Sequence, residues 1–175
     1  MFKKKWQQLR SRWWISWSMD IALMLVLVWG ISAWQSRHLL STAGDTLAPT
    51  FELTAVDGQV YRFPDRQTQS TLLYFFAPWC QVCRLSIGNL EKLRQVRGAE
   101  ELSILIIALD WQDLSEVKQF IAQQQLTLPV LMGTPSVAQA YHIRGFPTYY
   151  VLDAAGYIIE RSLGYSTELG LRLRT

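Results

Sequence analysis

Cysteine and histidine are the scarcest reactive residues in this chain of 175 residues. The sequence contains two cysteines, Cys80 and Cys83, and two histidines, His38 and His142. A structural zinc site needs four ligands, usually Cys or His, and His38 lies in a segment without strong periodicity. The scarcity therefore argues against a zinc-binding domain and leaves the closely spaced cysteines to be explained as a pair.

Charged residues are also few, and the excess of positive charge is confined to one end. They make up 18% of the chain, whereas hydrophobic residues make up 50%, a composition that excludes a disordered protein. Five basic residues and no acidic residue lie in the first 12 positions. Beyond Arg37, 11 Lys and Arg residues stand against 13 Asp and Glu residues, a net charge of −2. The body of the protein is not basic, so we expect no nucleic-acid partner.

A long apolar run lies near the N-terminus, and we see no internal repeat or low-complexity tract. Residues 13–34 form a 22-residue segment, long enough as a helix to cross a bilayer of ~30 Å. Tryptophans gather at both of its ends, as is typical of the membrane interface, and the preceding basic residues predict a cytoplasmic N-terminus. The predicted organisation is a cytoplasmic basic segment at 1–12, a transmembrane anchor at 13–34, a periplasmic linker at 35–48 and a folded domain at 49–175.

Two features of this N-terminal segment leave alternatives open. Asp20 would lie inside the apolar layer if the span begins at residue 13, or at the interface if the span begins at Ile21. A cleaved signal peptide is the rival interpretation, because Ser41 to Ala43 resembles a small-residue cleavage site. That site lies some ten residues past the apolar run, with Arg37 and His38 between them, so we favour an uncleaved anchor.

The rest of the chain alternates between strand and helix patterns. The predicted elements are a hairpin within 51–63 around Asp57-Gly58, a buried strand at 71–76, a helix from about Cys80 to Gly98, a second buried strand at 102–109, a helix capped by Asp113, an edge strand or connecting segment in 128–132, a short helix beginning at Pro135, a hairpin turning at 153–156 and a short helix in the tail. Strands joined by crossover helices imply a largely parallel sheet with helices on both faces.

The position of the cysteines favours a redox pair. If Cys80 opens the helix that follows the strand 71–76, unpaired backbone N–H groups and the helix dipole lower the pKa of its thiol. Cys83, Ile87 and Leu90 are spaced so that Cys83 faces the core. We therefore predict an exposed, activated Cys80 that attacks a substrate disulfide and a sheltered Cys83 that resolves the mixed disulfide.

Two other interpretations of the pair remain open. A purely structural disulfide would close a very small loop, which contributes little through chain entropy. Two thiolates can also bind Cu(I), so the competing class is a non-catalytic module that holds Cu(I) or docks a partner. A compartment outside the cytoplasm favours exchange chemistry, because disulfides form readily there.

Three stretches of the sequence resemble a known family. They are "GDTLAPTFELTAVDG" at 44–58, "FFAPWCQVC" at 75–83 and "YHIRGFPTYYVLDAAG" at 141–156. In this order they are similar to membrane-anchored thioredoxin-fold oxidoreductases of the TlpA/ResA/DsbE type, and the likeness covers about residues 44–165. The resemblance implies an α/β thioredoxin-like fold, with a central mixed sheet flanked by helices and a TlpA-type insert, preceded by one transmembrane helix.

The resemblance also implies roles for individual residues and partners. Pro147 would be a cis-proline facing the cysteine pair, Phe146 would shape specificity, and Trp79 would offer substrates a flat apolar surface. The dithiol carries two electrons itself, so no cofactor is expected. The implied partners are protein thiols and disulfides and a membrane electron donor of the DsbD type. The substrates would be apocytochrome c or proteins of copper-stress defence, and in the second case the chain would resemble oxidoreductases of the ScsD type. The implied location is the bacterial inner membrane, with the catalytic domain in the periplasm.

The sequence departs from the family pattern at several positions. Tyr74 stands where the family often has a buried carboxylate, and no Asp or Glu lies within 66–90. Proton transfer to Cys83 must therefore use water, a phenol or a distant acid, and Asp110 is a weak candidate that we expect at the surface. Gly88 replaces a helix-kinking proline. The neutral dipeptide between the cysteines does not set the direction of electron flow.

Overall fold

The computed structural model describes most of the chain, and the chain divides into two units, 1–37 and 38–175. The described residues are 19–28, 30–31, 38–43, 45–64 and 69–175. Residues 19–28 are helical and their side chains are exposed. Within the described ranges, no helix combines the length and the apolar character needed to cross a bilayer. The predicted cytoplasmic segment lies outside the described residues, and the predicted anchor lies partly outside them.

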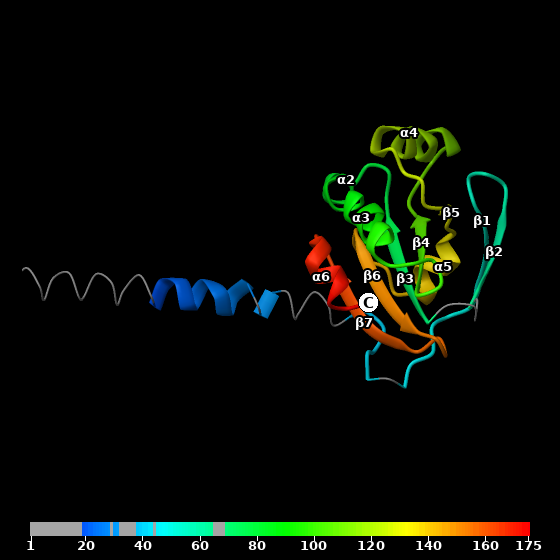
Figure 1. Cartoon of the computed structure of the whole chain (residues 1–175). Coiled ribbons are helices and arrows are strands. Elements are labelled where there is room, and N and C mark those ends of the chain that lie inside the picture. Colours follow the sequence, from blue (N-terminus) through cyan, green and yellow to red (C-terminus); the bar gives the residue numbers. More distant parts are fainter. Residues whose placement is uncertain (1–18, 29, 32–37, 44, 65–68) are drawn as a thin grey trace, which may run out of the picture. The chain divides into compact units, whose positions relative to one another are not determined.

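The second unit is a folded α/β domain (Figure 1). Its elements, in chain order, are β1 (Phe51–Thr54), β2 (Val60–Phe63), β3 (Ser70–Phe76), α2 (Gln81–Ser86), α3 (Gly88–Val96), β4 (Leu102–Ala108), α4 (Leu114–Gln124), β5 (Val130–Met132), α5 (Pro135–Ala140), β6 (Thr148–Asp153), β7 (Ile158–Leu163) and α6 (Glu168–Arg172). The hairpin β1–β2 turns at Gly58, whose φ of 91° is a conformation that glycine adopts readily. The predicted elements are confirmed in type and order, except that the helix predicted from about Cys80 to Gly98 is divided into two.

The central sheet has the strand order β5-β4-β3-β6-β7. Strands β5, β4 and β3 run parallel, whereas β6 and β7 are antiparallel to their neighbours. The resemblance correctly implies a mixed sheet. The prediction of a largely parallel sheet is wrong, because β6 pairs with β3 in the antiparallel direction and the β6–β7 hairpin adds a second antiparallel pair.

Strand β3 lies at the centre of the sheet and separates two apolar clusters. Its apolar residues are buried on both faces, as expected for a short continuous apolar run. Leu72, Tyr74 and Phe76 join the cluster formed with α2, α3, α4 and α6, which we call the cysteine face. Leu73 and Phe75 join the cluster formed with the β1–β2 hairpin and α5, which we call the hairpin face. Figure 1 shows these groups on opposite sides of the sheet.

The predicted helix after Cys80 is interrupted. Helix α2 ends at Ser86 and α3 begins at Gly88, with Ile87 as the residue between them. The interruption lies next to the glycine that replaces the family's helix-kinking proline. Gly98 does not form a left-handed cap. Helix α3 ends instead at Val96, and Arg97 follows as the C-cap residue with extended backbone angles.

Helices α4 and α5 begin at residues whose side chains cap them. Asp113 accepts a hydrogen bond from the Ser115 backbone N–H at 2.7 Å, and this bond lowers the pKa of the Asp113 carboxyl. Thr134 accepts from the backbone N–H of Val137, and Pro135 occupies the first turn of α5. The predicted starts of both helices are therefore confirmed.

Residues 38–43 and 45–48 pack against the domain, although residues 35–48 were predicted to be a linker. Leu39 is buried in the hairpin face. The Arg161 guanidinium of β7 donates to the backbone carbonyls of Leu39 and Leu40. Leu47 forms a bridge with Tyr157. These contacts join the segment to strands far away in the sequence, which a local pattern cannot reveal.

Candidate active site

Cys80 and Cys83 form a disulfide at the start of α2. Cys80 is the N-cap residue, with extended backbone angles, and its Sγ accepts a hydrogen bond from the Cys83 backbone N–H at 3.1 Å. The Cα atoms lie 5.2 Å apart, a separation typical of disulfides. The first turn of α2 thus directs a backbone donor at the sulfur of Cys80, where negative charge is favoured.

The two cysteines differ less in burial than the sequence predicts. Cys83 is fully buried, as expected. Cys80 is only 5% exposed, so the prediction of an exposed sulfur is wrong for this disulfide form. The bond to Cys83, which faces the core, keeps the Cys80 sulfur close to the helix. The exposed surface beside the disulfide is formed by Trp79, which is 59% exposed, and by Val82.

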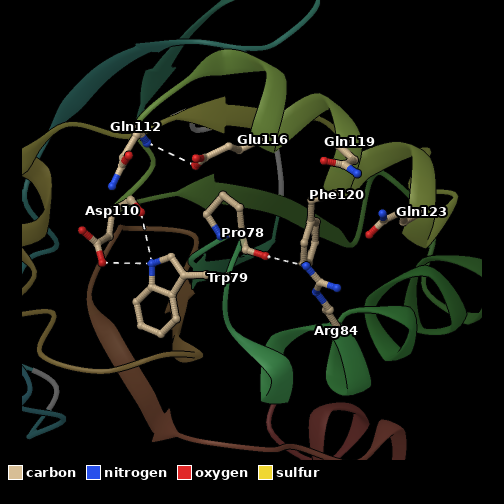
Figure 2. Close-up of a pocket in the computed structure, with 9 residues that line it drawn as sticks. All are labelled: Pro78, Trp79, Arg84, Asp110, Gln112, Glu116, Gln119, Phe120 and Gln123. Carbon is tan, nitrogen blue, oxygen red and sulfur yellow. Dashed lines mark hydrogen bonds between the residues drawn. The ribbon is translucent and has the colours of Figure 1, made fainter.

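The Trp79 side chain is held in place by two neighbours. Its indole Nε1 donates to the carboxylate Oδ2 of Asp110 at 3.0 Å and to the Asp110 backbone carbonyl at 3.2 Å (Figure 2). Its ring meets that of Phe146 edge-on, with centroids 5.8 Å apart. Asp110 is exposed, as expected, and has a φ of 50°. The hydrogen bond between Asp110 and Trp79 joins residues 31 positions apart in the chain and was not predicted from the sequence.

Pro147 lies at the start of β6 beside the end of β3. Its peptide bond with Phe146 is cis, as the resemblance implies. Thr148 pairs with Phe75, so this loop lies at the carboxyl end of β3, from which the chain continues to Cys80. Pro147 is buried and its carbonyl accepts from Gly164 N–H at 2.8 Å. The fold thus brings Phe146 and Pro147 to the cysteine end of β3.

Tyr74 belongs to a buried cluster of hydroxyl groups on the cysteine face. Its hydroxyl lies 3.0 Å from the Ser86 Oγ and donates to the Cys83 carbonyl at 3.4 Å. Burial is the main cause that raises the pKa of Tyr74 above its usual value, so the phenol stays protonated. The Tyr149 ring packs edge-on against Tyr74 at 4.9 Å. The position where the family often has a carboxylate is therefore part of a neutral, hydroxyl-lined environment.

Two other features bear on the site. Within the described part of the chain, no group of three or more His, Cys, Asp or Glu side chains is arranged to hold a metal ion. His142 is exposed and its Nδ1 lies 3.2 Å from the backbone carbonyl of His38. His142 therefore contacts the segment that begins at residue 38 and packs against the domain.

A mixed five-stranded sheet with a Cys-x-x-Cys disulfide at the start of a helix defines the class of thioredoxin-like thiol–disulfide oxidoreductases. The profile of the AhpC/TSA family matches residues 45–161. The chain belongs to this family, and it is an enzyme of the thiol–disulfide oxidoreductase type.

Named relatives agree with this assignment. The thioredoxin-like protein YneN of Bacillus subtilis is 28% identical over 153 residues, which cover 83% of this chain and 89% of that protein. The thiol-disulfide oxidoreductase ResA of Bacillus cereus is 28% identical over 124 residues, which cover 69% of this chain and 70% of that protein.

Solved structures share the fold. A thiol:disulfide interchange protein of the thioredoxin family from Chlorobium tepidum superposes with a TM-score of 0.66 at 28% identity, over 75% of this chain and 94% of that one. StoA from Bacillus subtilis has a TM-score of 0.65 at 22% identity, over 73% of this chain and 96% of that one, and shows the fold alone.

Proposed function

We propose that this chain is a membrane-tethered reductase of protein disulfides in a bacterial periplasm, with Cys80 as nucleophile and Cys83 as resolving thiol. The observation that carries the proposal is the hydrogen bond from the Cys83 backbone N–H to the Cys80 sulfur. In the dithiol form the same donor would stabilise a Cys80 thiolate, and the thiolate is the reactive species. Cys83 lies one turn further along the helix, so its sulfur is within bonding distance of Cys80.

The reaction proceeds by two exchange steps. The Cys80 thiolate attacks one sulfur of a substrate disulfide, forms a mixed disulfide and releases the other substrate sulfur as a thiolate. Cys83 loses its proton and attacks the Cys80 sulfur, which forms the Cys80–Cys83 disulfide and releases the second substrate thiolate. The substrate gains two electrons and the enzyme loses two. A dithiol donor in the membrane, of the DsbD type, would reduce the enzyme again by the same exchange.

Trp79, Phe146 and Pro147 are the proposed substrate-contacting residues. The Trp79 indole is largely exposed and held at a fixed angle by Asp110 and Phe146, so it offers a rigid apolar surface next to the disulfide. Pro147 has no backbone N–H, which leaves its loop without that donor for pairing within the sheet. Substrates of this site are protein chains in extended conformation, with apocytochrome c and copper-stress proteins as the proposed classes.

Trapping of mixed disulfides tests the proposed roles. The full-length Cys83→Ser variant should accumulate disulfide-linked complexes with substrate proteins in cells, because it attacks but cannot resolve. The matched Cys80→Ser variant should accumulate none. Retention of Cu(I) by the wild type without any trapped complex would contradict the enzymatic role and favour the copper-holding module.

Two further measurements test the direction and the location. The Cys80–Cys83 pair should be mostly dithiol in growing cells if the enzyme is a reductase, and alkylation of cell extracts quenched with acid measures this ratio. A mostly oxidised pair would contradict the reductase role. A C-terminal reporter enzyme that is active only outside the cytoplasm should be active when fused to the full chain, and an inactive, correctly folded reporter would contradict the periplasmic location.

A further inference from the structure

A polar pocket lies beside Trp79, between α2 and α4. Its volume is about 380 Å³. Arg84 of α2 and the side chains of Gln112, Glu116 and Gln119 line it, together with the Trp79 indole. Figure 2 shows Arg84 at one end of this group and Trp79 with Asp110 at the other. The pocket therefore adjoins the exposed indole that the proposed function assigns to substrate contact.

The charged groups of the pocket are not equally satisfied. The Asp110 carboxylate accepts from the Trp79 indole, and the Glu116 carboxylate accepts from the Gln112 backbone N–H at 3.3 Å. The Arg84 guanidinium donates to the Pro78 carbonyl at 3.3 Å. Its Nε–H, although shielded from solvent, has no hydrogen-bond partner in the part of the chain that the structure describes. The Arg84 guanidinium thus lacks a hydrogen-bond acceptor for one of its N–H groups.

The position of Arg84 relates this role to the reaction. The Arg84 backbone N–H donates to the Cys80 carbonyl at 3.2 Å, so the two residues are one helical turn apart. The Nε–H is closed off from the pocket, so an oxygen that enters the pocket would be held by the terminal amino groups of the Arg84 guanidinium through a charge-assisted hydrogen bond. Trp79 directly precedes Cys80 in the chain and lines the pocket, so the pocket adjoins the disulfide along the chain.

We propose that this pocket is a specificity subsite for the substrate polypeptide, and that it binds a side chain that ends in a carbonyl or carboxylate oxygen. Arg84 supplies the main donor, and the amide groups of Gln112, Gln119 and Gln123 supply further donors around it. Asn, Gln, Asp and Glu within a few residues of the substrate cysteine fit this chemistry. The inference rests on the proposed function, because it assumes that protein disulfides react at Cys80.

Symmetric peptide disulfides provide the probes. Each peptide carries one central cysteine among alanines, with Gln, Glu or Leu at one flanking position, and the scan covers the three positions on each side. The rate at which each probe oxidises the reduced full-length chain is measured in stopped flow. We expect the Gln and Glu probes to react ~10-fold faster than the Leu probe at one or more positions, the factor for about one net hydrogen bond to a charged group.

The variant Arg84→Met separates recognition from chemistry. It should remove the preference for Gln and Glu probes over Leu probes. Hydroxyethyl disulfide, which is too small to fill the pocket, serves as the reference substrate for any change in the reactivity of Cys80. Lys92→Met removes an exposed cation from α3, outside the pocket, and should keep the full preference.

The outcomes distinguish the two proposals. Equal rates for Gln, Glu and Leu probes with the wild type overturn the subsite, as does a preference that survives Arg84→Met. A uniform slowing of all probes and of hydroxyethyl disulfide by Arg84→Met, with the preference intact, also overturns it. If the reduced wild type fails to react with hydroxyethyl disulfide, the proposed function fails first and the subsite with it.

Discussion

Two pairs of buried tyrosines lie on opposite faces of the sheet, and their hydroxyl groups differ in how they are satisfied. On the hairpin face, Tyr141 donates to the Pro49 carbonyl at 2.6 Å, and Tyr150 donates to the Tyr141 carbonyl at 2.8 Å. On the cysteine face, Tyr74 shares a hydrogen bond with Ser86. The Tyr149 hydroxyl there is buried and makes no hydrogen bond of normal geometry in the described part of the chain, although the Ser86 and Ser166 hydroxyls lie close enough to lower its pKa.

The difference lies in what the buried hydroxyl groups contribute to the fold. Buried polar groups are almost always hydrogen-bonded, so a buried hydroxyl without a close partner adds little to stability. On the hairpin face, the Tyr150 hydroxyl also accepts a hydrogen bond from the Leu40 N–H, which joins the segment around residue 40 to the sheet. The cysteine face, which contains Cys83, keeps hydroxyl groups available next to the redox pair. The hydroxyl group without a close partner therefore lies on the face that contains Cys83.

The largest expected effect is a loss of stability at alkaline pH. Burial raises the pKa of Tyr74, Tyr141 and Tyr149 above the usual value of about 10, and that of Tyr150 to about 12. Above about pH 10 the unfolded chain ionises these phenols while the folded domain keeps them neutral. Below about pH 10 the stabilisation that comes from these neutral phenols is fully present. Above it, each buried tyrosine lowers the free energy of unfolding by ~1.4 kcal/mol per pH unit, until the pH reaches the pKa of that tyrosine in the folded domain.

Urea unfolding of the full-length chain between about pH 9 and pH 11 measures this slope. Tyr150→Phe should reduce the slope above pH 10 by about one proton, since it removes one of the four phenols. A stability that is independent of pH over this range would contradict the neutral state of the buried tyrosines.

The next largest effect is expected for Tyr141→Ala. The Tyr141 ring contacts those of Phe51, Phe75 and Tyr150, with centroids 5.0 to 6.1 Å apart. Its loss leaves a cavity in the hairpin face and should lower the free energy of unfolding by ~3–5 kcal/mol in urea titrations. Tyr165, which is 54% exposed, is the matched control, and its replacement by Ala should lower the free energy by less than ~1 kcal/mol. Similar losses for both variants would contradict the assigned core.

The smallest effect tests the comparison most directly. Tyr150→Phe leaves the Tyr141 carbonyl and the Leu40 N–H without their partner, and should lower the free energy of unfolding by ~1–3 kcal/mol. Tyr149→Phe removes a hydroxyl that makes no hydrogen bond of normal geometry in the described part of the chain, and should leave stability unchanged or slightly increased. Chemical unfolding at neutral pH compares the two variants. Equal losses of stability in the two variants would show that the tyrosine hydroxyl groups of the two faces contribute equally to the fold.

Features with a strong local cause were predictable from the sequence. The apolar run of β3 predicts a strand buried on both faces, Asp57-Gly58 predicts a turn, and Pro135 predicts the start of α5. The Cys-x-x-Cys pair after β3 predicts the position of the disulfide at a helix start. In each case the determining residues lie next to one another in the chain, so a short pattern contains the information.

Features that depend on distant residues were not predictable. The bond between Trp79 and Asp110 joins the end of β3 to the end of β4, and nothing in either segment marks it. The contacts of Arg161 with Leu39 and Leu40 span more than a hundred positions. The burial of Cys80 depends on its bonded state and on the packing of α2. The sequence singles out Tyr74 as a departure from the family pattern, but not the partner Ser86.

The attachment of the N-terminal segment has a mechanical consequence. Arg161 fastens residues 39 and 40 to β7, and Leu47 is bridged to Tyr157 just before that strand. A pulling force applied to the chain before residue 38 would therefore be transmitted to an edge strand, whereas β3, which leads to Cys80, lies two strands further into the sheet. The proposed active site would keep its geometry while such a force acts on the chain before residue 38.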